Sequence, residues 1–249
     1  MRIKLPRIPR KPVHVYSDAD CQLIIEKAGI LSRKSGIRWD LSVVLALTTG
    51  MRRGEILNLI WSDIDFDFEK QTVQVRPKRD SEKTWEWQVK DADHRTLPLV
   101  DGLVTLLAKH QGNQPEGYPY VFVPPKRYER IQELRAQGKW SYADSRNKVV
   151  NNFTRHFKLI LDKANTKGQF HDLRRTALTR FMNTSLTKHD IMAIAGHSQF
   201  ETTERFYLAV KDGLVDRARE AMQTIDTARL LQICCRDQTV ASNEKGQQS

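Results

Sequence analysis

The residues of this chain that could do chemistry lie in a few short segments, which read TGMRRGE, VKDADHR, HDLRRT, AGHS and TTERFY. A tyrosine hydroxyl can attack a phosphodiester, and guanidinium groups match the negative charge that then develops on the non-bridging oxygens. These segments therefore predict a site that holds a phosphodiester while a tyrosine attacks the phosphorus. The side chains that could form it are Arg52, Lys90, His171, Arg174, His197 and Tyr207.

The attack also needs proton transfers, and two of the segments supply groups for them. A tyrosine hydroxyl has a pKa of about 10, so it needs a base or positive charge nearby, and His171 is suited to accept its proton. His171 and Arg174 are three residues apart and would share one face of a helix. A lysine in a polar turn, such as Lys90, could deliver a proton to the leaving oxygen. Either arginine of the pairs Arg52–Arg53 and Arg174–Arg175 could bind the phosphate.

Each residue also has an ordinary structural explanation. A lysine in a turn is usually a solvated charge, a histidine after a helix-ending glycine is usually a C-cap residue, and a helix arginine is usually exposed. Tyr207, beside Phe206, would ordinarily be a core aromatic. The chemical interpretation therefore depends on the segments occurring together.

Two helices should place Arg52 at the edge of a packed core. Ser17 with Asp20 predicts a capping box, and the helix that it starts should stop at Gly29. The segment 40–49 is apolar nearly all round, which predicts a buried helix. Gly50 should end that helix, so that Arg52 lies in a tight turn before another short helix.

Between residues 71 and 99 the hydrophobic period changes from helical to alternating, which predicts a three-stranded antiparallel sheet. The links centred on RDSE and DADH would be polar turns. Lys90 has the opposite parity from the tryptophans and should point to solvent or to a ligand. The apolar faces of the three strands would carry Val73 and Val75, then Trp85, Trp87 and Val89, then Leu97 and Leu99.

The remaining patterns are helical. They cover 103–109, 126–139 and 146–164, and a moderately amphipathic helix is expected over 208–233. Thr187 with Asp190 predicts the cap of a further helix. The expected fold class is therefore mainly α, with one small three-stranded antiparallel sheet.

The charge of the chain favours a polyanionic partner. Its 249 residues include 41 Lys and Arg against 30 Asp and Glu, a net charge of +11, and nucleic acid is the commonest partner for such a surplus. A merely soluble basic protein is the alternative. Candidate DNA contacts lie in the proline-rich start of the chain, which could equally do nothing, and among the basic residues between 126 and 148. The residues chosen are Arg7, Arg10, Lys11, Lys126 and Arg127.

Composition disfavours several other classes of protein. Cys21, Cys234 and Cys235 form neither a disulfide framework nor a zinc spacing, which is typical of a reducing setting. No apolar run reaches the ~18 residues of a membrane span, and the start MRIKLPRIPRKP lacks the apolar core of a signal peptide. We therefore expect a soluble protein of the cell interior, with no membrane partner, no metal site and no small-molecule substrate.

In this order and at these separations, TGMRRGEILNL, VKDADHRTLPL, HDLRRT, AGHS and TTERFY resemble the catalytic domain of the tyrosine recombinases, the phage integrase family. The resemblance covers roughly residues 15–233. Its pattern favours Arg52 over Arg53 as the first phosphate ligand, and the HxxR spacing favours Arg174 over Arg175 as the second.

The resemblance also implies roles for the other residues. His171 would be the base, and Lys90, five residues before Arg95, would be the hairpin lysine that protonates the 5′-oxygen. His197 would donate a hydrogen bond to the scissile phosphate, Tyr207 would be the nucleophile, and Glu55 would brace the first arginine.

The chain departs from the family pattern in two places. The nucleophile usually stands nine residues after the GH histidine, a position that here holds Phe206, and Tyr207 comes one residue later. A slip in SQFETT would bring Tyr207 into register; without it the chain would bind DNA and not cut it. No N-terminal helical domain precedes residue 15, so we expect either a fragment or a protein that binds DNA with half the usual grip.

These observations predict a basic linker at 1–14, a catalytic domain at 15–235 and a disordered tail at 236–249. The predicted function is site-specific recombination of double-stranded DNA through a covalent 3′-phosphotyrosyl intermediate, by a homotetramer as in the family. No cofactor is expected, because the phosphotyrosine keeps the energy of the broken bond. Two alternatives stay open: a topoisomerase-like enzyme of type IB, and a DNA-binding module or recombinase fragment without catalysis.

Overall fold

The structure is a computed structural model that describes residues 14–90, 94–182, 184–196, 218–219 and 222. This part of the chain is mainly helical with one three-stranded antiparallel sheet, which confirms the expected fold class. The helices are α1 (Asp18–Ser35), α2 (Trp39–Thr49), α3 (Arg53–Leu57), α4 (Asp101–Gly112), α5 (Pro125–Ala136), α6 (Tyr142–Asn147), α7 (Phe153–Lys163), α8 (Phe170–Met182) and α9 (Lys188–Ala195), and η1 (Trp61–Asp63) is a 3-10 turn. The strands are β1 (Ile64–Asp65), β2 (Thr72–Val75) and β3 (Arg95–Pro98).

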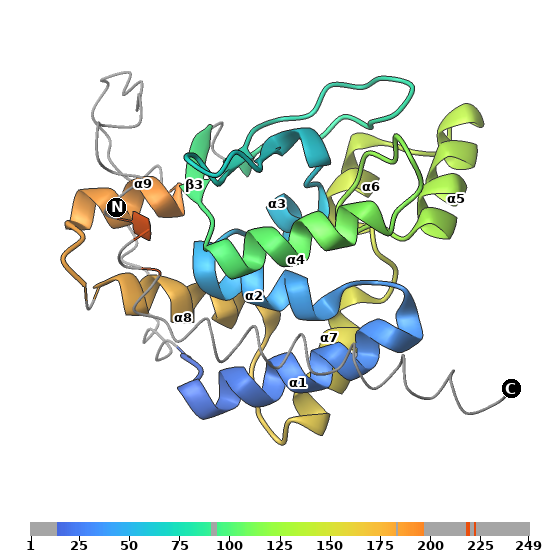
Figure 1. Cartoon of the computed structure of the whole chain (residues 1–249). Coiled ribbons are helices and arrows are strands. Elements are labelled where there is room, and N and C mark those ends of the chain that lie inside the picture. The colour runs from blue at the N-terminus through green and yellow to red at the C-terminus, as the bar shows by residue number, and fades with distance from the viewer. Residues whose placement is uncertain (1–13, 91–93, 183, 197–217, 220–221, 223–249) are drawn as a thin grey trace, which may run out of the picture.

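Helix α2 is the centre of the fold (Figure 1). All of its residues are buried, because α1, α4 and α8 pack against it on different sides. The sequence of α2 is apolar nearly all round, so this burial is the expected outcome. Gly50 ends the helix in the left-handed conformation (φ +67°), as predicted, and leads the chain directly to Arg52.

The first helix begins as predicted but ends later. The Ser17 hydroxyl accepts a hydrogen bond from the Asp20 amide at 3.1 Å, and the Asp20 carboxylate accepts one from the Ser17 amide at 3.1 Å. Gly29 does not stop the helix, which continues to Ser35 and ends at Gly36 (φ +70°). Gly29 is instead a buried residue inside α1, so tertiary packing outweighs its low helix propensity.

The sheet contains three strands, but they are not the three predicted. β2 lies in the middle, antiparallel to both β1 and β3. The segment 85–89, predicted as the middle strand, makes only an isolated bridge between Trp87 and Lys78. Its alternation is nevertheless real, because Trp85, Trp87 and Val89 are buried while Glu86, Gln88 and Lys90 are exposed.

The helices after the sheet follow the predicted pattern with one break. The pattern over 146–164 belongs to two helices, α6 and α7, because Asn152 takes a left-handed conformation (φ +53°) just before Phe153. Thr187 caps α9 through its hydroxyl, which accepts from the Asp190 amide at 3.2 Å. Among the described residues no helix is both long and apolar enough to cross a membrane.

Several predictions fall outside the described residues. They concern the linker over 1–13, almost all of the helix expected over 208–233, and the tail over 236–249. From the second of these segments the structure describes only Ala218, Arg219 and Met222.

Candidate active site

Helix α8 carries the histidine and the second arginine. Its first turn is fixed by Asp172, whose carboxylate accepts a hydrogen bond from the Gln169 amide at 2.9 Å. The helix packs against α2 through an apolar face on which Leu173, Ala177 and Phe181 are fully buried. Arg174 is also buried, at 2% exposure, whereas His171, one turn earlier, is exposed. Packing of α8 therefore sets Arg174 into the protein while His171 stays accessible.

The first arginine stands at the N-terminus of α3, where Glu55 holds it in two ways. The Glu55 carboxylate accepts a hydrogen bond from the Arg52 amide at 2.7 Å and one from the Arg52 Nη1 at 3.2 Å. A carboxylate at this position also offsets the positive end of the helix. Glu55 is 3% exposed. Burial alone would raise the pKa of Glu55, but Arg95 and Arg52 outweigh it and hold that pKa below its usual value.

Both arginines reach the same place, the C-terminal end of α9. Arg174 donates from Nη2 to the carbonyl oxygen of Ala195 at 2.5 Å, and from Nη1 to that of Gly50 at 2.5 Å. Arg52 donates from Nη2 to the carbonyl oxygen of Gly196 at 2.6 Å. The last carbonyls of a helix have no partner within it and carry partial negative charge. They can therefore hold two guanidinium groups together that would otherwise repel.

The neighbouring arginines take other contacts. The Arg53 guanidinium lies over the Phe153 ring, 5.5 Å from its centroid, and Arg175 Nη1 pairs with Asp172 at 2.8 Å. The structure thus brings Arg52 and Arg174 together at α9, as the sequence motifs indicated, and not Arg53 with Arg175.

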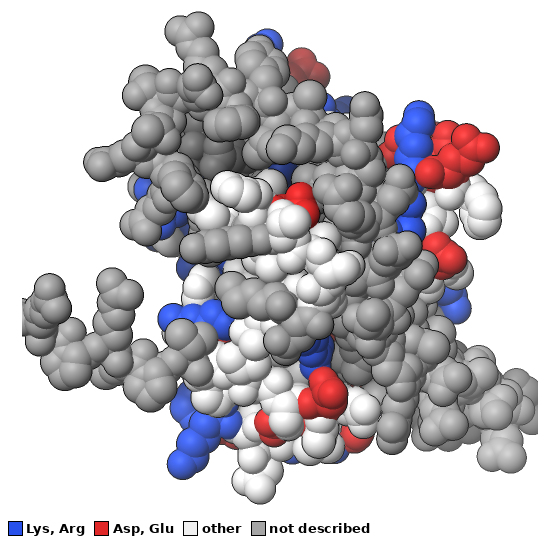
Figure 2. Space-filling view, turned by 90° about the vertical axis from the view of Figure 1, so that its left-hand side faces the viewer, with Lys and Arg blue, Asp and Glu red and all other residues white. Residues whose placement is uncertain are grey.

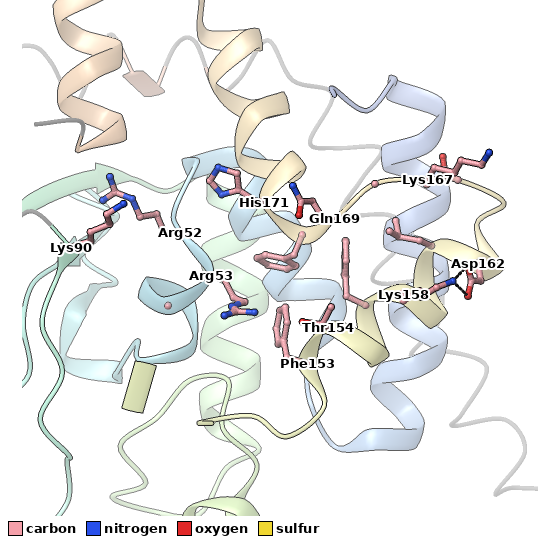
Figure 3. Close-up of a pocket in the computed structure, with 16 residues that line it drawn as sticks. Arg52, Arg53, Lys90, Phe153, Thr154, Lys158, Asp162, Lys167, Gln169 and His171 are labelled. Carbon is pink, nitrogen blue, oxygen red and sulfur yellow. Dashed lines mark hydrogen bonds and ion pairs between the residues drawn. The ribbon is translucent and has the colours of Figure 1, made fainter. Parts of the chain in front are cut away.

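Lys90 and His171 lie on one cavity with Arg52 (Figure 3). The cavity has a volume of about 680 Å³. It runs from these three side chains past Arg53 and Phe153, along α7 and toward the loop 164–169. Lys158 on α7 and Lys167 in that loop line its other end. Its floor is apolar and its rim is largely cationic, which suits an anionic ligand with an apolar part.

Electrostatics favour a neutral histidine beside charged arginines. Partial burial of the ring, together with the positive charges of Arg174 and Arg175, lowers the pKa of His171 below its usual value. His171 is therefore neutral at neutral pH and can accept a proton. Burial and the charge of Arg52 lower the pKa of Arg174 to about 10, which still leaves that guanidinium charged.

One residue of the site was not predicted. Arg95, at the start of β3, donates from Nη2 to Glu55 at 2.5 Å and from Nε to the carbonyl oxygen of Ile194 at 2.8 Å. Its side chain is 7% exposed. The sequence shows Arg95 only as the first polar residue of a strand, and its partners lie 40 and 99 residues away. An arginine at the base of the lysine hairpin is the one local signal that could have drawn attention to it.

Of the other predicted site residues, some lie outside the described residues and two lie away from the cavity. His197, Tyr207, Arg7, Arg10 and Lys11 lie outside the described residues. Lys126 and Arg127 are on α5, which lies across the molecule from α8 and α9 (Figure 1). Lys126 is exposed, whereas the Arg127 guanidinium donates to the carbonyl oxygens of Lys148 and Val149 and so helps to attach α5. A role in DNA binding stays a prediction for both.

Figure 2 shows the face of the molecule turned by 90° from Figure 1. In its described part, Lys and Arg side chains form separate groups with Asp and Glu among them. The described residues of this face thus show no single continuous basic patch. Within the same described ranges, no group of three or more His, Cys, Asp or Glu side chains could hold a metal ion.

Comparison with known proteins identifies the family. The sequence profile of the Phage integrase family matches residues 19–213, so the chain belongs to the phage integrase family. It is 27% identical over 230 residues to a tyrosine recombinase XerC-like protein of Caldanaerobacter subterraneus subsp. tengcongensis. The matched region covers 84% of this chain and 54% of that protein. It is 25% identical over 231 residues to the tyrosine recombinase XerA of Pyrococcus furiosus. The matched region covers 93% of this chain and 67% of that protein. The chain therefore spans about half to two thirds of the length of these relatives.

Solved structures agree with the fold. A crystal structure of XerA recombinase matches with a TM-score of 0.52 and 19% identity, over 90% of this chain and 66% of that one. The Tn1549 transposon integrase in complex with transposon right-end DNA matches with a TM-score of 0.54 and 17% identity, over 87% of this chain and 67% of that one. These likenesses show that the chain has the fold of a tyrosine recombinase catalytic domain.

Proposed function

We propose that the chain is a site-specific tyrosine recombinase that cuts and rejoins duplex DNA through a covalent 3′-phosphotyrosyl intermediate. The observation that carries the proposal is the meeting of Arg52 and Arg174 at the C-terminal end of α9, beside a cavity that also exposes His171 and Lys90. Family membership and relatives described as tyrosine recombinases support the same chemistry.

In the proposed reaction the Tyr207 oxygen attacks the phosphorus, and the bond between phosphorus and the 5′-oxygen breaks. His171 accepts the tyrosine proton, and Lys90 gives a proton to the departing 5′-oxygen. Arg52 and Arg174 stabilise the charge on the non-bridging oxygens, and His197 adds a hydrogen bond. A 5′-hydroxyl of a second strand then attacks the phosphotyrosine and restores a phosphodiester, so that no outside energy source is needed.

DNA would follow the cavity between α7 and α8. Arg53, Lys158 and Lys167 line that cavity beyond the candidate catalytic groups and could bind the phosphates next to the one that is cut. The Tn1549 integrase, which has a similar fold, is described in complex with DNA. The proposal further places the chain in the bacterial cytoplasm or nucleoid and has four copies acting on two DNA sites, with the segment 214–231 docking on a neighbouring copy.

Covalent capture from a randomised pool tests the proposal and finds the target sequence in the same experiment. The full chain would be incubated with a pool of nicked duplexes whose central segment is randomised, because the nick lets the released end diffuse away and traps the enzyme. Adducts that survive denaturant would be isolated and their DNA sequenced. The proposal predicts an enriched sequence motif in which the protein is joined to the 3′-phosphate end at the break and the other end carries a 5′-hydroxyl.

The rivals give different results in the same assay. A topoisomerase-like enzyme would form adducts without sequence enrichment and would relax a supercoiled plasmid as a monomer. A binding module would enrich a motif in native gels and form no adduct. Either result would contradict the proposed function of this chain.

A further inference from the structure

Three guanidinium groups, and not two, surround the end of α9. Arg95, Arg174 and Arg52 donate to the successive carbonyl oxygens of Ile194, Ala195 and Gly196. Two of these arginines have roles in the proposed reaction, but Arg95 does not. It does not line the cavity on which Arg52, Lys90 and His171 lie, and its Nε and Nη2 both donate to groups of the protein.

The contacts of Arg95 join three parts of the site. Its own strand, β3, follows the segment that carries Lys90, and β3 packs against α9. Nη2 binds the Glu55 oxygen that also accepts from the Arg52 amide. Nε binds the last turn of α9, the helix that leads to His197. One side chain therefore connects β3, the Glu55 carboxylate that holds Arg52, and the last turn of α9.

Space and polarity around Arg95 indicate more than a structural ion pair. Its Nη1 is buried and has no hydrogen-bond partner among the described residues. A Cβ added to Gly196 would lie 2.9 Å from that nitrogen and 3.6 Å from Arg52 Nη1. Gly196, in the left-handed conformation (φ +58°), is therefore confined between the two guanidinium groups. The arrangement leaves little freedom for Arg52 to move without Arg95.

We propose that Arg95 is a positioning residue for strand cleavage, which holds Glu55 and the end of α9 so that Arg52 and Arg174 meet one phosphate together. This inference rests on the proposed function. Arg95 does not touch the substrate; it fixes the groups that do. Without this support the catalytic groups would shift slightly from the positions that the reaction requires. A small shift of this kind is enough to slow a reaction strongly.

The same sheet supplies a matched control. Arg76, just after β2, pairs through Nε with the fully buried carboxylate of Asp63 at 2.7 Å. This is also an arginine bound to a buried acid, but its hydrogen bonds among the described residues go to Asp63 and Ser62, and none of them reaches α9 or the proposed site. Arg76→Gln should therefore cost stability without any specific effect on cleavage.

The test compares wild type, Arg95→Gln, Arg95→Lys and Arg76→Gln in full-length chains. Thermal unfolding reports stability, and gel shifts on the duplex found by covalent capture report DNA binding. Single-turnover adduct formation on the nicked form of that duplex, measured from pH 5 to pH 9, reports cleavage. We expect Arg95→Gln to bind DNA as wild type does and to cleave about 100-fold more slowly, and Arg95→Lys to fall between the two.

The pH profile separates positioning from mere structure. The charged groups that face Glu55 are Arg52 on α3, Arg95 on β3 and Arg174 on α8. Without Arg95 the larger of the two charges that oppose burial is lost, so the pKa of Glu55 rises and its carboxylate is lost at a higher pH. In Arg95→Gln the protonation of Glu55 should then add to that of His171 and steepen the acidic limb of the cleavage rate, whereas the limb should keep its wild-type shape in Arg95→Lys and Arg76→Gln.

The outcomes are distinct. If wild type forms no adduct, the proposed function itself fails. If wild type cleaves and Arg95→Gln cleaves equally fast, or slows only as much as Arg76→Gln with the same pH profile, the positioning role is wrong. If Arg95→Gln does not fold, Arg95→Lys decides, because a wild-type cleavage rate in that variant would show that simultaneous contact of one guanidinium group with Glu55 and Ile194 is not needed.

Discussion

Arg52 and Arg174 are 122 residues apart in the sequence, yet both guanidinium groups end on consecutive carbonyls of one helix. This geometry explains how two positive groups can lie at the end of the same helix without a bound anion between them. The carbonyl oxygens offset part of the repulsion between the two guanidinium groups, and the Glu55 carboxylate offsets a further part. At the scale of single residues, this arrangement supports the proposal that the site is a preassembled receptor for an anion.

The choice between neighbouring arginines can be tested directly. Arg174→Lys should lower the rate of covalent adduct formation by about 100-fold or more, because an ammonium cannot keep both the backbone contacts and a planar contact with phosphate. Arg175→Lys should leave the rate near that of wild type, since Arg175 pairs with Asp172. Equal losses in the two variants would contradict the assignment of Arg174.

The acid–base role of His171 predicts a pH dependence. The pKa of His171 lies below its usual value because of partial burial and the charges of Arg174 and Arg175. Only the neutral ring can accept a proton, so the cleavage rate should rise with pH through that pKa and then level off. Arg175→Gln removes one of these charges, which raises the pKa and moves the acidic limb to higher pH. A limb that stays in place in Arg175→Gln would argue against His171 as the base.

At this scale the sequence predicted most of the described site. The HxxR spacing located His171 and Arg174, and the separation of three residues between Arg52 and Glu55 located the brace. Arg95 was missed because its importance depends on Glu55 and Ile194, which are distant in sequence and come near only in the fold.

At the scale of elements, the site depends on where three short helices begin or end. Helix α2 ends at Gly50, α3 begins at Arg53, and α9 ends at Gly196. The glycines at the ends of α2 and α9 have positive φ, which only glycine adopts without strain. The turns around the site are therefore defined by local sequence, and these were the elements that could be predicted.

The sheet shows where local pattern fails. The alternation over 85–89 reflects side chains packed on one side of an extended segment, and it contains no information about which backbone pairs with which. β1 has only two residues, too few to produce any period, yet it takes the place beside β2 that was assigned to 85–89. Strand pairing is a tertiary property, whereas burial alternation is a local one.

A glycine at the start of α8 predicts a stability effect of defined sign. Gly168 has φ +136°, and a Cβ there would lie 2.5 Å from Tyr16 Oη and 3.0 Å from Asp172 Oδ2. Gly168→Ala should therefore lower the free energy of unfolding in urea by roughly 1–3 kcal/mol. Gly112→Ala, at the end of α4 with open space around it, should leave that energy unchanged or slightly raised. Equal stability of Gly168→Ala and wild type would show that the contact of the chain start with α8 is loose.

At the scale of the whole molecule, the net charge of +11 serves binding more than chemistry. Each phosphate neutralised on duplex DNA steepens the fall of affinity with salt. Lys167 lines the cavity far from the candidate catalytic groups, so Lys167→Gln should reduce the slope of log K against log salt by about 0.9. Lys109→Gln, an exposed change on α4 outside that cavity, should not alter the slope. An unchanged slope in Lys167→Gln would remove this end of the cavity from the proposed DNA path.

The central claim is that Tyr207 becomes covalently joined to DNA. The most direct measurement is covalent capture on the nicked duplex, with wild type, Tyr207→Phe and the double variant Phe206→Tyr, Tyr207→Phe compared on a denaturing gel. We predict a shifted band in wild type that is absent in Tyr207→Phe and is not restored by moving the tyrosine one residue earlier. A band that persists in Tyr207→Phe, or no band in any of the three while DNA binding is intact, would contradict the account.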